Sequence, residues 1–387
     1  MLMRATYPTA EMLLAQASEI AGLIDFGPKG FREGLDRLLE SLRDDARFSE
    51  EAAAGVTPLL VKRLVNRLLI EQWFAENPGA SHASIEAPIS IIGLPRTGTT
   101  ALANMMSLDP QFRCLRPWEQ AEPCPPPVLA TEANDPRRLS HIAGLEAMAR
   151  NRPDLMAMHL FDADASVEDT EVLGLDFAAQ QAVWPVFGYH QWYRDRDMRE
   201  TFAYHHRVAQ MLQSSRPPNR WLFKAPHHKF HLEAVANAYP DIRFIFTHRD
   251  PAKSVPSYAS FISSLYPAGA ADEIGLETIG RQTHNHLLIG MQRAVEARGR
   301  LGEGRFIDVY QHEIDRQPIE TLQRIYTKLG LDLKPEVIDA VRRWGKSNSA
   351  GAHGTHRYTP EQFGLSVDQI RSDFGFYIQA FDVPVGG

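Results

Sequence analysis

Two short segments of the sequence combine glycine, hydroxyl and basic residues in patterns suited to binding an anion. The first covers residues 93–100, with the letters GLPRTGTT, and directly follows the apolar run Ile89–Ile92. Glycines allow the backbone to curl so that successive N–H groups point inward, and a following helix adds positive potential. We therefore expect an anion-binding loop here; a glycine turn without a ligand is the alternative.

Arg96 distinguishes this loop from that of the nucleoside triphosphatases. Those enzymes carry lysine directly after the second glycine, and this lysine acts with magnesium on the γ-phosphate. Thr99 stands at that position here, and the basic residue lies inside the loop. A phosphosulfate carries less charge at its end than a triphosphate, because its terminal sulfonate is singly charged. Backbone N–H groups, hydroxyls and one or two cations would suffice for it, so we expect no metal ion.

The second segment joins an apolar strand to a helix. Arg249 follows the run FIFTH at 244–248, and Asp250 and Pro251 are favourable N-cap and first-turn residues. Ser257 falls on the next predicted helix. One guanidinium and one hydroxyl near a helix start are suited to a phosphate. The alternative is a strand–helix connection with a surface arginine.

Together, these segments resemble the sulfotransferases that use 3′-phosphoadenosine 5′-phosphosulfate (PAPS). The loop PRTGTT is most similar to bacterial members and tyrosylprotein sulfotransferases, and the arginine followed by a serine eight residues later is similar to the family's 3′-phosphate segment. For the 3′-phosphate, the resemblance implies Arg249 and Ser257. For the 5′-phosphosulfate, it implies Arg96, Thr97, Gly98, Thr99 and Thr100.

The resemblance also implies residues for the transfer itself, namely Arg96, Lys224 and Glu119. Lys224 ends the predicted strand 221–223, where open α/β sheets place ligands, and its Lys-Ala-Pro is similar to Lys-Asp-Pro of the tyrosylprotein enzymes. Glu119 is the expected base, because related enzymes carry an acidic base in that region and the neighbouring Trp118 would raise its pKa.

Other residues stay open for the base and for the nucleotide. Glu122 is the near alternative to Glu119, and cytosolic sulfotransferases use histidine, which leaves His159, His227 and His228. Tyr310 matches in position a tyrosine that packs near adenine in some relatives. The segment 346–358 would close over the 3′-phosphate or form a plain loop. His227 and His231 have helical metal-ligand spacing without an obvious carboxylate partner, so we expect substrate lining or core packing.

A framework of parallel strands must position these residues. We expect strands near 89–92, 221–223, 242–247 and 305–310, giving an α/β, P-loop-like, three-layer fold around a central parallel sheet. Residues 1–85 are predicted as a helical N-terminal cap and 86–387 as the catalytic domain. Within it, the proline-rich stretch 117–137 reads as a loop. The aromatic-rich stretch 138–215 reads as a helical insertion that lines an acceptor pocket, or whose aromatic residues pack the core.

The composition limits the classes of partner and the cellular location that we expect for this protein. The formal charge of −7 argues against broad nucleic-acid binding, and no apolar run reaches the length of a membrane span. Cys114 and Cys124 read as free thiols, and Glu11 and Glu19 interrupt any signal-like stretch, so we expect a cytoplasmic location. A homodimer is one assembly we allow for.

The sequence thus predicts transfer of a sulfuryl group from PAPS to a hydroxyl or phenol of a small, apolar molecule or lipid. Two alternatives stand beside it: a P-loop kinase-like phosphotransferase, and a non-catalytic nucleotide-binding protein of the same fold.

Overall fold

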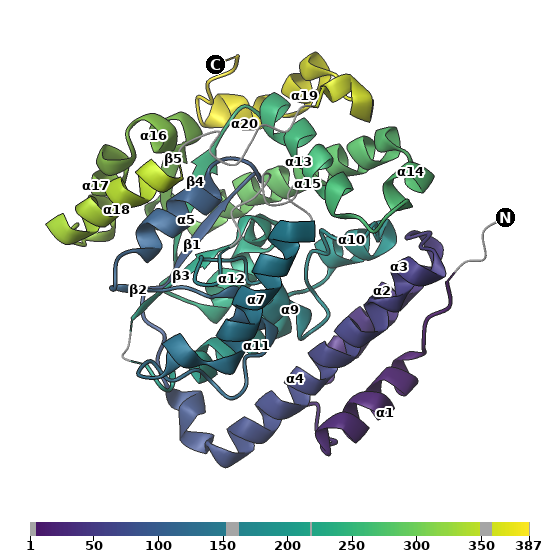
Figure 1. Cartoon of the computed structure of the whole chain (residues 1–387). Helices are drawn as coiled ribbons and strands as arrows, with labels where there is room; N and C mark the ends of the chain where they lie inside the picture. The colour runs from purple at the N-terminus through teal and green to yellow at the C-terminus, as the bar shows by residue number, and fades with distance from the viewer. Residues whose placement is uncertain (1–4, 152–161, 217–218, 349–357, 387) are drawn as a thin grey trace.

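A single five-stranded parallel sheet organises the chain (Figure 1). The computed structural model describes residues 5–151, 162–216, 219–348 and 358–386. The strand order is β2-β3-β1-β4-β5, so the strand before the predicted anion loop lies at the centre. The strands are β1 (Ile89–Gly93), β2 (Phe112–Arg113), β3 (Arg220–Lys224), β4 (Arg243–His248) and β5 (Phe306–Tyr310).

Helices cover both faces of the sheet, which makes three layers. Ile89 and Ile91 of β1 pack on one face, against α5 (Thr99–Ser107), α17 (Pro318–Leu329) and α18 (Pro335–Ser347). Ile92 belongs to the core on the other face, with α12 (Leu232–Ala238), α13 (Pro251–Leu265) and α15 (Leu276–Leu301). Every residue of β1 is buried, because helices cover both faces of the strand. The predicted α/β fold with its parallel sheet is therefore confirmed.

The N-terminal part is helical and packs on one side of the molecule (Figure 1). Arg67 joins it to the middle of the chain: its fully buried guanidinium donates to the backbone oxygens of Phe26, Pro28 and Leu175. Whether the cap folds as a unit of its own stays a prediction. Its elements are α1 (Ala10–Ala21), α2 (Phe31–Asp44), α3 (Glu50–Ala54), α4 (Val56–Glu76) and η1 (Pro78–His82).

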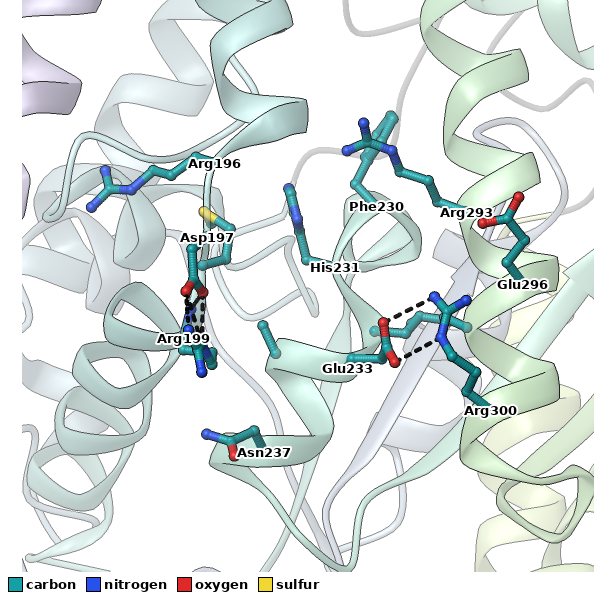
Figure 2. Close-up of a pocket in the computed structure, with 14 residues that line it drawn as sticks. Arg196, Asp197, Arg199, Phe230, His231, Glu233, Asn237, Arg293, Glu296 and Arg300 are labelled. Carbon is teal, nitrogen blue, oxygen red and sulfur yellow. Dashed lines mark hydrogen bonds and ion pairs between the residues drawn. The ribbon is translucent and has the colours of Figure 1, made fainter.

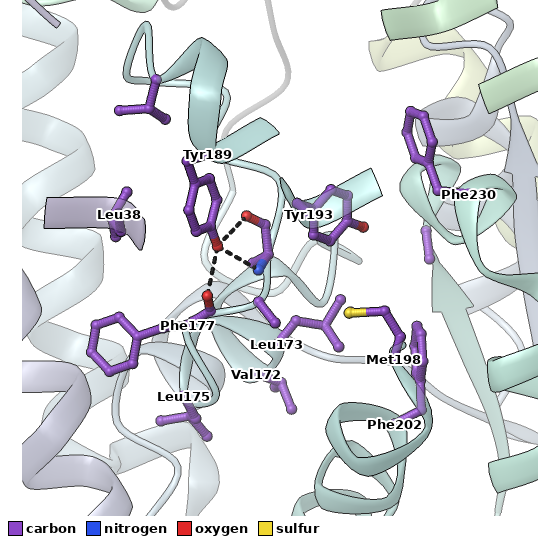
Figure 3. Close-up of a cluster of buried hydrophobic side chains, with 14 of the residues drawn as sticks. Leu38, Val172, Leu173, Leu175, Phe177, Tyr189, Tyr193, Met198, Phe202 and Phe230 are labelled. Carbon is purple, nitrogen blue, oxygen red and sulfur yellow. Dashed lines mark hydrogen bonds between the residues drawn. The ribbon is translucent and has the colours of Figure 1, made fainter. Parts of the chain in front are cut away.

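The middle stretch places many of its aromatic residues in the core. Figure 3 shows Tyr189 and Tyr193 within the cluster of buried side chains, where the hydroxyl of Tyr189 donates to the backbone oxygen of Phe177 at 2.7 Å. Core packing, one of the two sequence interpretations, thus describes these side chains. The predicted loop at 117–137 is wrong in part, because it contains the short elements α6 and η2. The elements are α6 (Pro117–Ala121), η2 (Glu132–Asn134), α7 (Pro136–Asn151), α9 (Thr170–Gly174), α10 (Phe187–Asp195) and α11 (Arg199–Gln213).

The remaining elements connect and close the fold. Cys114 and Cys124 are free thiols, as predicted. Over the part of the chain that the structure describes, no helix is both long and apolar enough to cross a bilayer. The remaining elements are η3 (Pro226–Phe230), α14 (Ala270–Ile274), η4 (Glu303–Arg305), α16 (Gln311–Arg316), η5 (Pro360–Phe363), α19 (Val367–Asp373) and α20 (Gly375–Ala380).

Candidate functional site

The loop between β1 and α5 depends on its two glycines. A Cβ on Gly93, whose φ is 141°, would lie 2.5 Å from the backbone oxygen of Thr247. Gly98 has φ 88° and is the N-cap of α5. The hydroxyl of Thr97 is buried: it donates to the backbone oxygen of Leu94 at 2.7 Å and lies 2.6 Å from the hydroxyl of Thr247. The side chain of Thr97 therefore supports the loop from inside, and its backbone N–H is the group suited to an anion.

The two predicted anion-binding segments meet at Arg96. Its Nε donates to the hydroxyl of Ser257 at 3.3 Å, and the guanidinium of Arg249 donates to its backbone oxygen at 2.7 Å. Partial desolvation lowers the pKa of Arg96; Tyr358 opposes this shift and Arg249 adds to it. Two guanidinium groups so close together repel one another, and a bound anion would relieve that repulsion.

Arg249 also faces a cavity of about 510 Å³ between the ends of β4 and β5. Its Nε is buried and has no hydrogen-bond partner among the described residues. Lys253 and Arg316 also line this cavity, together with Asp250 and Asp315, so it has charged groups of both signs. Tyr310 is not one of the lining residues: its hydroxyl donates to the backbone oxygen of Phe381 at 2.7 Å.

Lys224 is the last residue of β3, which pairs directly with β1. Its side chain is almost fully buried, and its Nζ lies 3.4 Å from the carboxylate of Glu168. The strand order therefore places this ammonium at the same sheet edge as the loop, as the sequence predicted. The pairing with Glu168 was not predicted.

Glu119 does not have the environment predicted for a base. Its side chain is 0% exposed, and both carboxylate oxygens accept hydrogen bonds from Arg113. One oxygen also accepts from the backbone N–H of Arg116, which completes a capping box at the start of α6. An acceptor hydroxyl has no access to this carboxylate, so the geometry assigns Glu119 to structure and argues against the predicted catalytic role.

The other candidates for the base differ in position. Glu122 is exposed and pairs with Lys62 at 2.6 Å. His159 lies outside the described residues, as does most of the segment 346–358. His227 and His228 are buried, and the Nε2 atom of each lies within 2.9 Å of the carboxylate of Asp169.

Asp169 is the carboxylate partner that the sequence analysis missed. Besides His227 and His228, it pairs with the Nε2 of His205 at 2.9 Å. The three histidines come from α11 and η3, far from Asp169 along the chain, so no local spacing signals the cluster. Asp169, His227 and His228 have the residue types of a metal site. Their nitrogen–oxygen separations are 2.8–2.9 Å, so the buried carboxylate of Asp169 makes close charge contacts with three imidazoles.

His231, for which we expected substrate lining or core packing rather than a metal site, does not join the cluster around Asp169. The ring of His231 instead packs edge-on against Tyr193, with 5.0 Å between the ring centroids. Burial, with help from the charge of Arg293, lowers the pKa of His231 to about 3. His231 is therefore a neutral packing residue at ordinary pH.

A further cavity, of about 660 Å³, lies between α11, α12 and α15 (Figure 2). Its arginines are largely paired with acidic neighbours, as Arg199 is with Asp197 and Arg300 with Glu233. None of the residues predicted to bind the donor or carry out the transfer lines it. The candidate site is therefore the sheet edge formed by the loop, Lys224 and Arg249.

Comparisons with known proteins agree with this geometry. Residues 88–335 match the model of the sulfotransferase family. The crystal structure of sulfotransferase STF9 from Mycobacterium avium is similar with a TM-score of 0.90 and 28% identity, over 99% of each chain. That of sulfotransferase STF1 from Mycobacterium tuberculosis H37Rv is similar with a TM-score of 0.86 and 27% identity, over 96% of this chain and 100% of that one.

No curated protein matched the sequence. Because the family model spans well over half of the chain, and two solved sulfotransferases share its fold over nearly the whole length, the chain belongs to the sulfotransferase family.

Proposed function

We propose that this enzyme transfers a sulfuryl group from PAPS to the hydroxyl of a small, apolar acceptor. The observation that carries the proposal is the meeting of the two anion-binding segments, in which Arg96 contacts both Ser257 and Arg249. A nucleotide with charged groups on both its 5′ and 3′ sides needs two such segments. A nucleoside triphosphate needs only the first.

The residues present fit this donor. The loop and the first turn of α5 offer backbone N–H groups to the 5′-phosphosulfate, because the first N–H groups of a helix have no partner within it. The buried, unpartnered Nε of Arg249 and the hydroxyl of Ser257 are suited to the 3′-phosphate. The adjoining cavity of about 510 Å³ has the size of a small-ligand site.

Transfer would then be an in-line displacement at sulfur. By analogy with phosphoryl transfer, the transition state is loose, so positioning and charge stabilisation dominate the catalysis. Lys224 and Arg96 supply two positive charges beside the loop, and they would stabilise the charge that develops on the bridging oxygen. The leaving group is adenosine 3′,5′-bisphosphate (PAP).

A cavity of about 770 Å³ between α6 and α7 supports the proposed acceptor class. Trp118, Leu145, Met148 and Val167 line it, so its wall is largely apolar. Val167 directly precedes Glu168, the partner of Lys224. This cavity supports an apolar acceptor. Residues of α7, a helix within the predicted insertion, form part of its wall.

A transfer assay tests the proposal. The enzyme is incubated with PAPS radiolabelled in its sulfate and a panel of alcohols and phenols, in the presence of EDTA. We expect labelled product from the wild type and a loss of about 100-fold or more in kcat for Lys224→Met, as is typical when one donor to a developing oxyanion is removed. Arg300→Ala, which changes an exposed arginine paired with Glu233, is the matched control and should keep full activity. Transfer of phosphate from ATP with magnesium, and none of sulfate, would overturn the proposal.

A further inference from the structure

We infer that Glu168 is the general base that takes the proton of the acceptor hydroxyl, an assignment that rests on the proposed sulfuryl transfer. Its carboxylate lies between two cationic groups of the site: one oxygen is 3.4 Å from the Nζ of Lys224, and the other is 3.7 Å from the Nδ1 of His227. The side chain is 38% exposed. A molecule arriving from solvent can therefore reach it, which is not true of Glu119.

His227 is a positioning residue for this carboxylate. Its Nε2 lies 2.8 Å from one oxygen of Asp169, which fixes the ring so that Nδ1 faces Glu168. Burial alone would lower the pKa of His227, but the charge and hydrogen bond of Asp169, together with Glu168, raise it to about 9. The ring is therefore charged at neutral pH and attracts the carboxylate of Glu168.

Asp169 is itself held rigidly against the sheet. Its second oxygen lies 2.9 Å from both His205 and His228. His228 in turn lies 3.0 Å from the hydroxyl of Ser90, a residue of the central strand β1, and His205 lies 2.7 Å from the hydroxyl of Tyr239. The network thus connects the central strand to Glu168 through the close contacts of Asp169 with the histidines, and a base needs such positional precision.

The proposed step balances without a further reactant. The acceptor oxygen forms a bond to sulfur while its proton moves to a carboxylate oxygen of Glu168. The bond from sulfur to the bridging oxygen breaks, and its electron pair leaves on the phosphate of PAP. The sulfate ester and PAP are released, and Glu168 returns its proton to water.

The charged and titratable groups that face Glu168 come from three elements. They are Lys224 of β3, His227 and Lys229 of η3, and Tyr258 of α13. The positive groups favour the carboxylate form, so the rate should rise with pH as Glu168 loses its proton and then reach a plateau. This acid limb should disappear in Glu168→Gln and shift to higher pH in His227→Asn, which removes one of the positive charges.

The test compares Glu168→Gln with Glu233→Gln, which changes an exposed glutamate paired with Arg300. The acceptors are cyclohexanol, phenol and 4-nitrophenol, with release of sulfate to water measured alongside. General-base catalysis is worth about 10²–10⁴-fold in rate. We expect a loss of that size in kcat for Glu168→Gln with cyclohexanol, and a much smaller loss with 4-nitrophenol, which ionises without a base. Glu233→Gln should match the wild type, and PAP affinity should be unchanged in both variants.

Two results would overturn the base assignment while leaving the proposed function intact. One is wild-type turnover of cyclohexanol by Glu168→Gln. The other is an equal loss with all three acceptors, which would show that Glu168 only positions its neighbours. A wild-type protein that binds PAP but transfers label to no acceptor, water included, would contradict the proposed function and the base assignment together.

Discussion

At the scale of single residues, the carboxylates of this chain separate into structural and chemical groups by their access to solvent. Glu119 is fully buried and held by Arg113, whereas Glu168 is partly exposed and lies beside Lys224. Glutamate therefore has a structural role at position 119 and a proposed catalytic role at position 168. The difference is set by packing, because a buried carboxylate needs a paired cation, while a base needs an open face.

Glu119→Gln should therefore act on stability. The change leaves the buried guanidinium of Arg113 without a counter-charge, and breaking a buried ion pair costs about 3–5 kcal/mol. We expect a clear fall in Tm by calorimetry, with kcat unchanged at temperatures where the variant is folded. The exposed Glu122→Gln should leave Tm unchanged. Lost turnover at an unchanged Tm would instead restore Glu119 as the base.

The sequence could predict only those site residues whose signal is local. Arg96 and Gly98 lie in one loop, and Arg249 and Ser257 lie in one strand–helix unit, so short motifs contain them. Glu168 and Asp169 have no such motif. Their partners Lys224, His227 and His228 come from another part of the chain, and only tertiary folding brings the two groups together.

At the scale of elements, the loop between β1 and α5 is the most constrained part of the site. Gly98 has φ 88°, a region that costs an ordinary residue about 1–2 kcal/mol, and a Cβ there would lie 3.0 Å from the Cδ1 of Ile314. A side chain at this position should displace the first turn of α5, whose N–H groups are proposed to bind the donor.

We therefore expect Gly98→Ala to weaken PAP binding by about 10-fold or more, since 1.4 kcal/mol corresponds to a factor of ten. Isothermal titration measures this affinity directly. Gly79→Ala is the matched control, because a Cβ on Gly79 would meet open space. Unchanged PAP affinity in Gly98→Ala would show that this turn does not hold the nucleotide.

The short helix η3 carries two buried groups, His227 and Lys229, whose pKa values are shifted in opposite directions. Burial lowers the pKa of His227, but Asp169 and Glu168 outweigh burial and raise this pKa from 6.5 to about 9. The protonated ring therefore stabilises the folded protein fully below pH 6.5, and this stabilisation is lost as pH rises through 9. Burial lowers the pKa of Lys229 from 10.5 to about 7, with Glu168 opposing. Burial of Lys229 therefore lowers the free energy of unfolding most strongly below pH 7, and this destabilisation disappears as pH rises toward 10.5.

Variants should separate these two effects in a series of Tm measurements from about pH 6 to about pH 10. We expect His227→Asn to lower Tm most at the acid end, with the deficit shrinking toward alkaline pH. Lys229→Met should raise Tm at the acid end, with a gain that also shrinks. Two curves that run parallel to the wild type would refute both assignments.

Elements differed in how well the sequence predicted them. The four longer strands are buried apolar runs bounded by turn residues, and each was expected close to its observed place. The two-residue strand β2 was not predicted, because so short a segment carries no periodicity. The helix α6 was not predicted, because the surrounding prolines favour a loop. Pro117 at its first position and the capping box of Glu119 nevertheless stabilise it.

At the scale of the whole molecule, the proposed donor site draws on elements that lie far apart in the sequence. Asp250, next to Arg249, is the N-cap of α13 and accepts from the backbone N–H of Ala252. Its other oxygen accepts from Arg371 of α19 at 2.7 Å. The C-terminal helices therefore hold the strand–helix junction that presents Arg249, while the facing loop comes from the first strand of the sheet.

We propose that these parts together bind a nucleotide that carries a 3′-phosphate. Isothermal titration of PAP, AMP and ATP with magnesium against the wild type and Arg249→Ala tests it directly. Hydrogen bonds to charged groups are worth about 1.5–3 kcal/mol, so PAP should bind about 10-fold or more tighter than AMP, with or without EDTA. Arg249→Ala should remove most of that difference. Equal affinities of the wild type for PAP and AMP, or tighter binding of ATP with magnesium, would contradict the account.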